Sequence, residues 1–232
     1  MTSFIDPEFG EITIHKRRGS RSIHIKVGTD GRYVATVPPL TPVRYIKHVV
    51  ETSRESLRKI AKNTSVMQPY VDGQAVGMHH TIAVVPTQLV RDAEVKILNN
   101  KLLVYLPPTI QLDSPAVQQQ IRDAAVRILR REAKAYLPDA LTQLATQHGF
   151  SYSRVRFSHA AGRWGSCSST GTISLNIALM KLPEPLIQYV LIHELCHTRQ
   201  MNHSPAFWTE VAAIDPHYKL HKRQIAQHTP AV

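Results

Sequence analysis

The sequence predicts an α+β protein with a β-hairpin-rich N-terminal region, residues 1–112, and a C-terminal metal-binding catalytic core, residues 113–232. Three observations predict this class. Two hairpin patterns occur in the first half, each followed by a helical pattern, and the second half carries two histidines one helical turn apart. Hydrophobic residues make up 43% of the 232 residues and charged residues 19%, which is enough apolar material to close a core. Disorder is therefore excluded as the main state.

The first half contains a weak internal repeat of two β-hairpins. Alternating apolar residues, β-branched side chains and tight-turn dipeptides predict the strands, and a Pro-Pro pair follows each hairpin. The first hairpin spans residues 22–27 and 33–37 around a turn at Asp30-Gly31, and the second spans 95–98 and 102–106 around Asn99-Asn100.

A helix is expected after each hairpin, at residues 42–62 and 114–136. Ser114 followed by Pro115 is typical of a helix N-cap with proline at the first helical position. A strand-hairpin-helix unit used twice is the predicted organisation.

The second half changes character, with 7 of the 13 histidines lying beyond residue 150. The pattern there predicts short strands, a Gly/Ser-rich loop and two further helices, of which the last is stopped by Asp215-Pro216. The expected strands are 154–158 and 172–175, the loop is 162–171, and the helices are 184–200 and 206–214.

The strongest chemical signal is His193-Glu194-Leu195-Cys196-His197. Positions i and i+4 of a helix share one face, so His193 and His197 are expected to bind a single metal ion. Glu194 lies one step round the helix and is predicted to be the general base of a hydrolase. Imidazole ligands and an open tetrahedral position favour zinc. The alternative is an ordinary helix with two satisfied core histidines.

A catalytic zinc site needs a third protein ligand. His203 is the first candidate, because Met201-Asn202 is expected to end the helix and a histidine in that reversal folds back toward the first two. Glu210, on the following helix, and His217, after the proline break, remain open as alternatives.

The two cysteines are expected to have no catalytic role. Cys196 points about 100° away from His197 on the helix, which favours core packing over ligation. Cys167 lies in the predicted loop, where a nucleophile is conceivable but the metal motif already provides an activated water. Arg163, in the same loop, is a candidate for stabilising an oxyanion or holding a phosphate, or else a structural arginine bonded to loop carbonyls.

Two separate motifs, in this order and spacing, resemble the YgjP-like metal-dependent hydrolase family, which is related to SprT-like and other zincin metalloproteases. The motifs are Arg163-Trp-Gly-Ser-Cys167 with Ile173-Ser-Leu-Asn176, and Tyr189–His197 with Met201–Trp208. The resemblance implies a zincin-like catalytic core in which His193, His197 and His203 bind zinc and Glu194 is the base. It also implies that Arg163, Trp164, Ser166 and Asn176 matter to the site.

The substrate is predicted less sharply than the site. Metallopeptidase-type hydrolysis of a peptide is the first hypothesis. The net charge of +11 supports two alternatives, a nucleotide phosphoanhydride hydrolase and a basic DNA-associated zinc protein. The clusters lack the interleaved aromatic residues of a nucleic-acid-binding motif. The basic residues form three clusters: Lys16, Arg17, Arg18 and Arg21; Arg54, Arg58, Lys59 and Lys62; Arg127, Arg130, Arg131 and Lys134.

Cytoplasmic localisation without a membrane partner is the expectation from two further features. Two cysteines in 232 residues form no disulfide framework, which favours a reducing compartment. No apolar stretch approaches the roughly 20 residues of a membrane-spanning helix.

Overall fold

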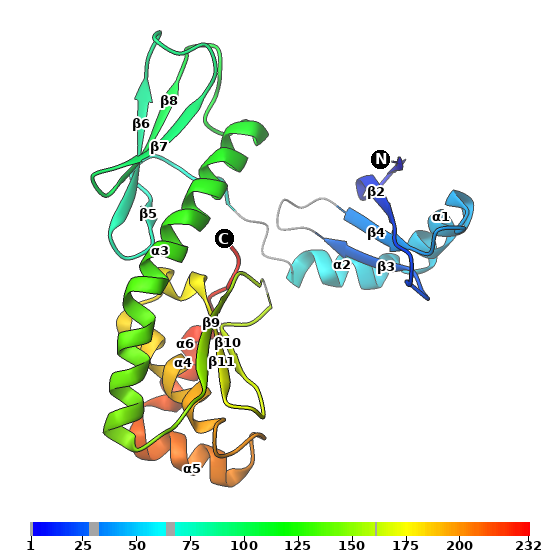
Figure 1. The fold of residues 1–232 in the computed structure, drawn as a ribbon. Coiled ribbons are helices and arrows are strands. Elements are labelled where there is room, and N and C mark those ends of the chain that lie inside the picture. Colours follow the sequence, from blue (N-terminus) through cyan, green and yellow to red (C-terminus); the bar gives the residue numbers. More distant parts are fainter. Residues whose placement is uncertain (1, 28–32, 64–67, 161) are drawn as a thin grey trace. The chain divides into compact units, whose positions relative to one another are not determined.

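The computed structural model describes residues 2–27, 33–63, 68–160 and 162–232, and it is a mixture of helices and small mixed sheets (Figure 1). The predicted α+β class is therefore confirmed. The chain divides into two compact units, Met1–Gln68 and Pro69–Val232. This division differs from the expected boundary after residue 112, because the second hairpin region shares one hydrophobic core with the long helix that follows it.

The N-terminal unit contains a four-stranded sheet in the order β1-β2-β4-β3. Strands β2 and β4 are parallel, while β1 and β3 pair antiparallel with their neighbours. Buried residues such as Ile12, Ala35 and Val50 form the separate core of this unit. Its elements are β1 (Thr2–Asp6), β2 (Gly10–Lys16), β3 (His24–Val27), β4 (Tyr33–Val37), α1 (Val43–Thr52) and α2 (Arg54–Asn63).

The second sheet has the same topology, in the order β5-β6-β8-β7. Its central strands β6 and β8 are again parallel, and its outer strands are antiparallel to their neighbours. The internal repeat seen in the sequence is thus a repeated sheet of four strands. The strands are β5 (Ala75–Val76), β6 (His80–Pro86), β7 (Glu94–Leu98) and β8 (Lys101–Leu106).

Both predicted hairpins are confirmed by the pairs β3–β4 and β7–β8. In the second hairpin, Asn99 and Asn100 have φ of 46° and 59°, the left-handed values that the tight turn needs and that asparagine tolerates. The Asp30-Gly31 turn of the first hairpin lies outside the described residues. The helix expected over 42–62 is instead two helices, with a break at Ser53 between α1 and α2.

The helix expected over 114–136 is longer than predicted, because α3 runs from Pro115 to His148. Ser114 and Pro115 begin it as expected, but it continues through Pro138, which lacks the N–H of a normal helical residue. Leu137 and Leu141, on either side of that proline, are completely buried. Their burial offsets the lost hydrogen bond, and Gly149, with φ of 67°, ends the helix.

The C-terminal part consists of a three-stranded sheet and short helices. β10 forms a short edge strand inside the region expected to be a loop, and α4 ends at Cys196 rather than at residue 200. None of the helices in the described part of the chain is both long and apolar enough to cross a membrane. The elements are β9 (Arg154–Ser158), β10 (Gly165–Cys167), β11 (Thr172–Asn176), a 3-10 helix η1 (Ile177–Lys181), α4 (Glu184–Cys196), α5 (Pro205–Ile214) and α6 (Tyr218–Ile225).

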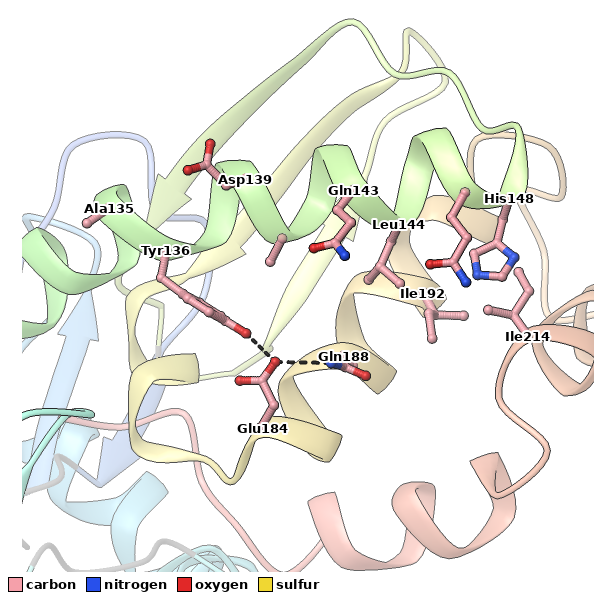
Figure 2. A pocket seen from close by; sticks show the side chains of 12 residues that line it. Ala135, Tyr136, Asp139, Gln143, Leu144, His148, Glu184, Gln188, Ile192 and Ile214 are labelled. Carbon is pink, nitrogen blue, oxygen red and sulfur yellow. Dashed lines mark hydrogen bonds between the residues drawn. The ribbon is translucent and has the colours of Figure 1, made fainter.

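Helix α4 is held along α3, with a groove of about 400 Å³ between them (Figure 2). At one end of this groove, the hydroxyl of Tyr136 on α3 donates a hydrogen bond to the carboxylate of Glu184, which also accepts one from the amide of Gln188 at 3.1 Å. These polar contacts, together with the buried face of α4, fix the helix that carries the His-Glu-x-x-His pattern.

Candidate metal centre

Three imidazoles converge at the C-terminal end of α4. His193 and His197 come from successive turns, and His203 comes from the reversal between α4 and α5. The Nε2 atom of His193 lies 3.2 Å from that of His197 and 3.1 Å from that of His203. All three ligand atoms lie within 4.8 Å of one another, so they fit one shared cation.

Aromatic side chains of α5 support these imidazoles. Phe207 is completely buried, and its ring centroid lies 4.5–4.9 Å from those of all three histidines. Trp208 stacks on His203 at 5.6 Å. Ser204 caps α5 by accepting a hydrogen bond from the backbone N–H of Phe207, which fixes the start of that helix below the site.

The protonation of the cluster suits cation binding. Burial lowers the pKa of His193 to about 3, and the positive charges of His197, His203 and Lys222 act in the same direction. His193 is therefore neutral at physiological pH, as a metal ligand must be. His197 Nδ1 donates to the carbonyl of Gln200 at 2.9 Å, which leaves its Nε2 facing the other two histidines.

Glu194 lies beside the cluster in an unusual environment. Glu194 is 5% exposed, and its Oε2 has no hydrogen-bond partner among the described residues. Burial raises the pKa of Glu194 to about 8, although the positive charge of Arg163 opposes that rise. A buried carboxyl whose proton affinity lies near neutrality is suited to general acid–base catalysis. An orphaned oxygen next to three convergent imidazoles also fits a site built around a cation and water.

The strand and loop 162–167 form one wall of the site. An added Cβ on Gly165 of β10 would stand 2.6 Å from Oε1 of Glu194, so the backbone of β10 packs directly against that carboxylate. Asn176 is fully buried at the end of β11, and its amide donates to the carbonyls of Ala160 and Arg163 at 2.7 and 2.9 Å. Asn176 thereby holds the loop that presents the Arg163 side chain, whose charge is felt at Glu194.

The alternative third ligands lie elsewhere. Glu210 forms an ion pair with Arg199 at 2.7 Å, and among the described residues the three-histidine group is the one cluster suited to a metal. His217 lies against His221 instead, with ring centroids 6.4 Å apart. Sequence reasoning did not assign a role to Phe207, Gly165 or Lys222. Gly165 and Phe207 lie within the two motifs, which was the one signal for them, and nothing in the sequence pointed to Lys222, since the contacts that define these roles connect separate elements.

Neither cysteine has the lowered pKa of an activated thiol. Cys196 is completely buried, and burial raises its pKa to about 12. Cys167 lies on β10 rather than in an irregular loop, and burial together with the charge of Glu194 raises the pKa of its thiol. Both side chains are therefore protonated at neutral pH.

A family model described as YgjP-like, metallopeptidase domain, matches residues 21–228. The chain belongs to the YgjP-like family. Membership supports a metal-dependent peptidase and hence a hydrolase that uses a divalent metal ion, in agreement with the three-histidine cluster. No curated protein matches the chain.

Two solved structures are similar to part of this YgjP-like chain, and both are metallopeptidase zymogens. Abylysin of Pyrococcus abyssi is 30% identical, covers 39% of this chain and 92% of its own, and has a TM-score of 0.36. Jannalysin of Methanocaldococcus jannaschii is 22% identical, covers 39% of this chain and 93% of its own, and has a TM-score of 0.35.

Proposed function

We propose that the protein is a zinc-dependent peptidase in which His193, His197 and His203 bind the metal and Glu194 is the general base. The observation that carries this proposal is the convergence of three Nε2 atoms next to a buried, unpaired carboxylate. Three neutral imidazoles with an open fourth position favour zinc. When bound, the ion would supply Lewis acidity and would lower the pKa of water, so that a nucleophile could form at neutral pH.

The residues of the chain then carry the proton and the charge. Glu194 takes a proton from the attacking water and returns it to the leaving nitrogen of the scissile peptide. Arg163 is proposed to stabilise the oxyanion that develops on the substrate carbonyl, because its positive charge acts on Glu194.

The test compares wild type with Glu194→Gln, both supplied with zinc, on a pool of peptides and nucleoside triphosphates analysed by mass spectrometry. We expect peptide fragments from the wild type only, and a loss of turnover of about 10²–10⁴-fold in the variant with its zinc content unchanged. Peptide cleavage that survives Glu194→Gln refutes the general-base role. Cleavage of triphosphates without peptide products refutes the peptidase proposal.

The third ligand is tested separately by zinc content. His203→Ala should bind zinc far more weakly than wild type, while Glu210→Gln should bind it normally, because Glu210 is engaged by Arg199. The reverse result would move the third ligand to α5.

A further inference from the structure

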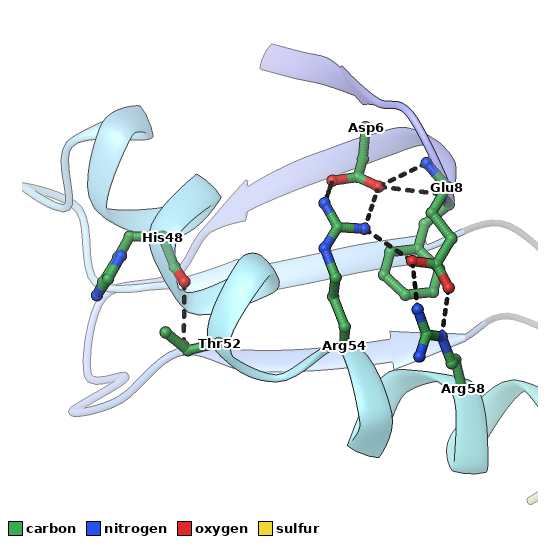
Figure 3. A network of polar contacts seen from close by, with 7 residues as sticks. Asp6, Glu8, His48, Thr52, Arg54 and Arg58 are labelled. Atoms are coloured by element: carbon green, nitrogen blue, oxygen red, sulfur yellow. Dashed lines mark hydrogen bonds and ion pairs between the residues drawn. The ribbon is translucent and has the colours of Figure 1, made fainter.

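The structure distinguishes the three basic clusters found in the sequence. Arg54 and Arg58 on α2 are neutralised within the N-terminal unit: Arg54 bonds Asp6 at 3.1 Å, and both arginines contact Glu8, at 2.9 and 2.5 Å (Figure 3). Arg131 on α3 lies 2.8 Å from Nε2 of His80, whose other ring nitrogen contacts Glu132. These basic residues contribute to the fold, whereas Arg127, Arg130 and Lys134 of the α3 cluster are exposed and form no ion pair with a described residue.

The N-terminal cluster differs from these, because its side chains have no ion-pair partner among the described residues and most of them line one hollow. Residues 12–27 contain five lysines and arginines and no acidic residue. All five side chains are exposed, and none of them forms an ion pair with a residue in the described part of the chain. The five are Lys16, Arg17, Arg18, Arg21 and Lys26. A patch of unpaired cations of this density attracts a polyanion.

This patch is concave. Its arginines, together with His24 and Lys26 of the edge strand β3, line a cavity of about 690 Å³. The backbone at Gly19 turns with φ of 89°, which brings the arginines on either side of it around the same hollow. Guanidinium groups that surround a hollow can each donate two hydrogen bonds to a phosphate.

A second, apolar hollow of about 530 Å³ adjoins the first, and Arg21 and Ser22 line both. Two of the residues that line it are exposed large apolar side chains: Leu40 is 95% exposed and Tyr45, at the start of α1, is 55% exposed. An exposed aromatic ring beside unpaired arginines offers a stacking surface next to a phosphate site.

We propose that this surface of the N-terminal unit binds a single-stranded nucleic acid. Phosphates of the strand occupy the basic hollow, and a base stacks on Tyr45. A single strand fits better than a duplex or a lipid bilayer, because it offers both phosphates for the basic hollow and unpaired bases that can stack on an aromatic ring. The sequence did not reveal the stacking residue, since Tyr45 comes from the helix after the sheet and not from the basic segment. The proposal does not depend on the peptidase activity.

The experiment measures binding of the full chain to a fluorescent oligothymidylate of about twelve nucleotides by anisotropy at several salt concentrations. Five phosphate contacts predict a slope of log affinity against log salt of about −3.5 for the wild type. The triple variant Arg17→Gln/Arg18→Gln/Arg21→Gln should have a slope of log affinity against log salt that is shallower by about 2. The matched control, Lys101→Gln/Lys134→Gln/Arg223→Gln, removes the same charge from exposed positions of the other unit and should leave the slope unchanged.

Tyr45→Ala tests the stacking step without changing charge. We expect affinity for the single strand to fall about tenfold or more, with the salt slope retained and with duplex binding unaffected. Equal weakening by both triple variants, a flat salt dependence of the wild type, or tighter binding to phosphatidylserine vesicles than to the oligonucleotide would each overturn the proposal. The slope of log affinity against log salt for the wild type tests the proposal even if a variant fails to fold.

Discussion

Gly165 gives the most direct test of how the catalytic carboxylate is positioned. Its φ lies outside the left-handed region, so alanine is compatible with the backbone, and the effect of Gly165→Ala is purely steric. The new Cβ would stand 2.6, 2.7 and 2.8 Å from Oε1, Cγ and Cδ of Glu194, whereas ordinary contacts are 3.4–4 Å. The carboxylate must therefore retreat by about 0.8 Å from its place beside the three histidines, an estimate taken from the shortfall in van der Waals contact.

A displacement of that size has a large catalytic cost. Misplacing a reacting group by about 1 Å reduces turnover on the order of 10²-fold, which corresponds to about 2.7 kcal/mol in the activation free energy. We expect Gly165→Ala to lose about this factor in kcat for peptide cleavage. Zinc content should match wild type, because the side chain displaced is not one of the proposed ligands.

Gly162→Ala is the matched control, because a Cβ at that position in the same loop meets nothing within 4 Å. Its turnover should stay within about twofold of wild type, as expected of a surface substitution. If Gly165→Ala cleaves peptides as fast as Gly162→Ala, then Glu194 does not need its observed position and the reasoning fails.

Two further substitutions test the supports of each unit. Asn176→Ala removes the buried amide that bonds the carbonyls of Ala160 and Arg163, so thermal denaturation should show a loss of about 2 kcal/mol and peptide turnover should also fall. Unchanged stability would contradict this role. Burial alone would raise the pKa of Asp6, but hydrogen bonds from two backbone N–H groups and from Arg54 lower it below 3.8. Because the folded pKa is depressed, the carboxylate stabilises the fold above about pH 4. Urea unfolding of Asp6→Asn should thus show lower stability than wild type at pH 7, and the difference should vanish as the pH falls through the folded pKa. A difference independent of pH would refute the ionic contribution.

The site could be predicted from the sequence as far as its residues are close along the chain. His193 and His197 share a helical face by spacing alone, and the helix reversal indicated His203, which the structure places at hydrogen-bond distance from His193. The wall opposite Glu194 could not be predicted by spacing, because Gly165 meets the carboxylate only through the pairing of β10 with β11 and the packing of β10 on α4.

The fold was predictable where turn chemistry marks the strands. Both hairpins carry such signals, but β2 and β6 are not part of a hairpin with a tight-turn dipeptide and were not among the predicted strands, so the parallel pairs β2–β4 and β6–β8 were not anticipated. The end of α3 was misplaced because Pro138 normally stops a helix. Burial on both sides of that proline overrode the local preference, which is tertiary information that no short window of sequence contains.

The repeat shows how one structural problem is solved twice with different residues. Strand pairing makes Asp6 and Val76 equivalent, since they lie opposite Gly10 and His80 at the turns β1–β2 and β5–β6. Each turn has two backbone N–H groups that need an acceptor. In the first sheet Asp6 accepts both, at 2.9 and 3.1 Å. Valine cannot, so in the second sheet a carboxylate from another element, Glu132 on α3, accepts them at 2.7 and 3.2 Å.

Glu132 therefore joins the second sheet to the helix that supports the metal centre. It is 7% exposed, and it also contacts Nδ1 of the buried His80 at 2.7 Å. Glu132→Ala would leave Nδ1 of this imidazole and two backbone N–H groups unpaired, which should cost roughly 3 kcal/mol. For a unit of this size we expect a fall in melting temperature on the order of 10 °C. Lys134→Ala, an exposed substitution on the same helix, should change the melting temperature little. If the two variants have the same melting temperature, the turn between β5 and β6 does not depend on the carboxylate of Glu132.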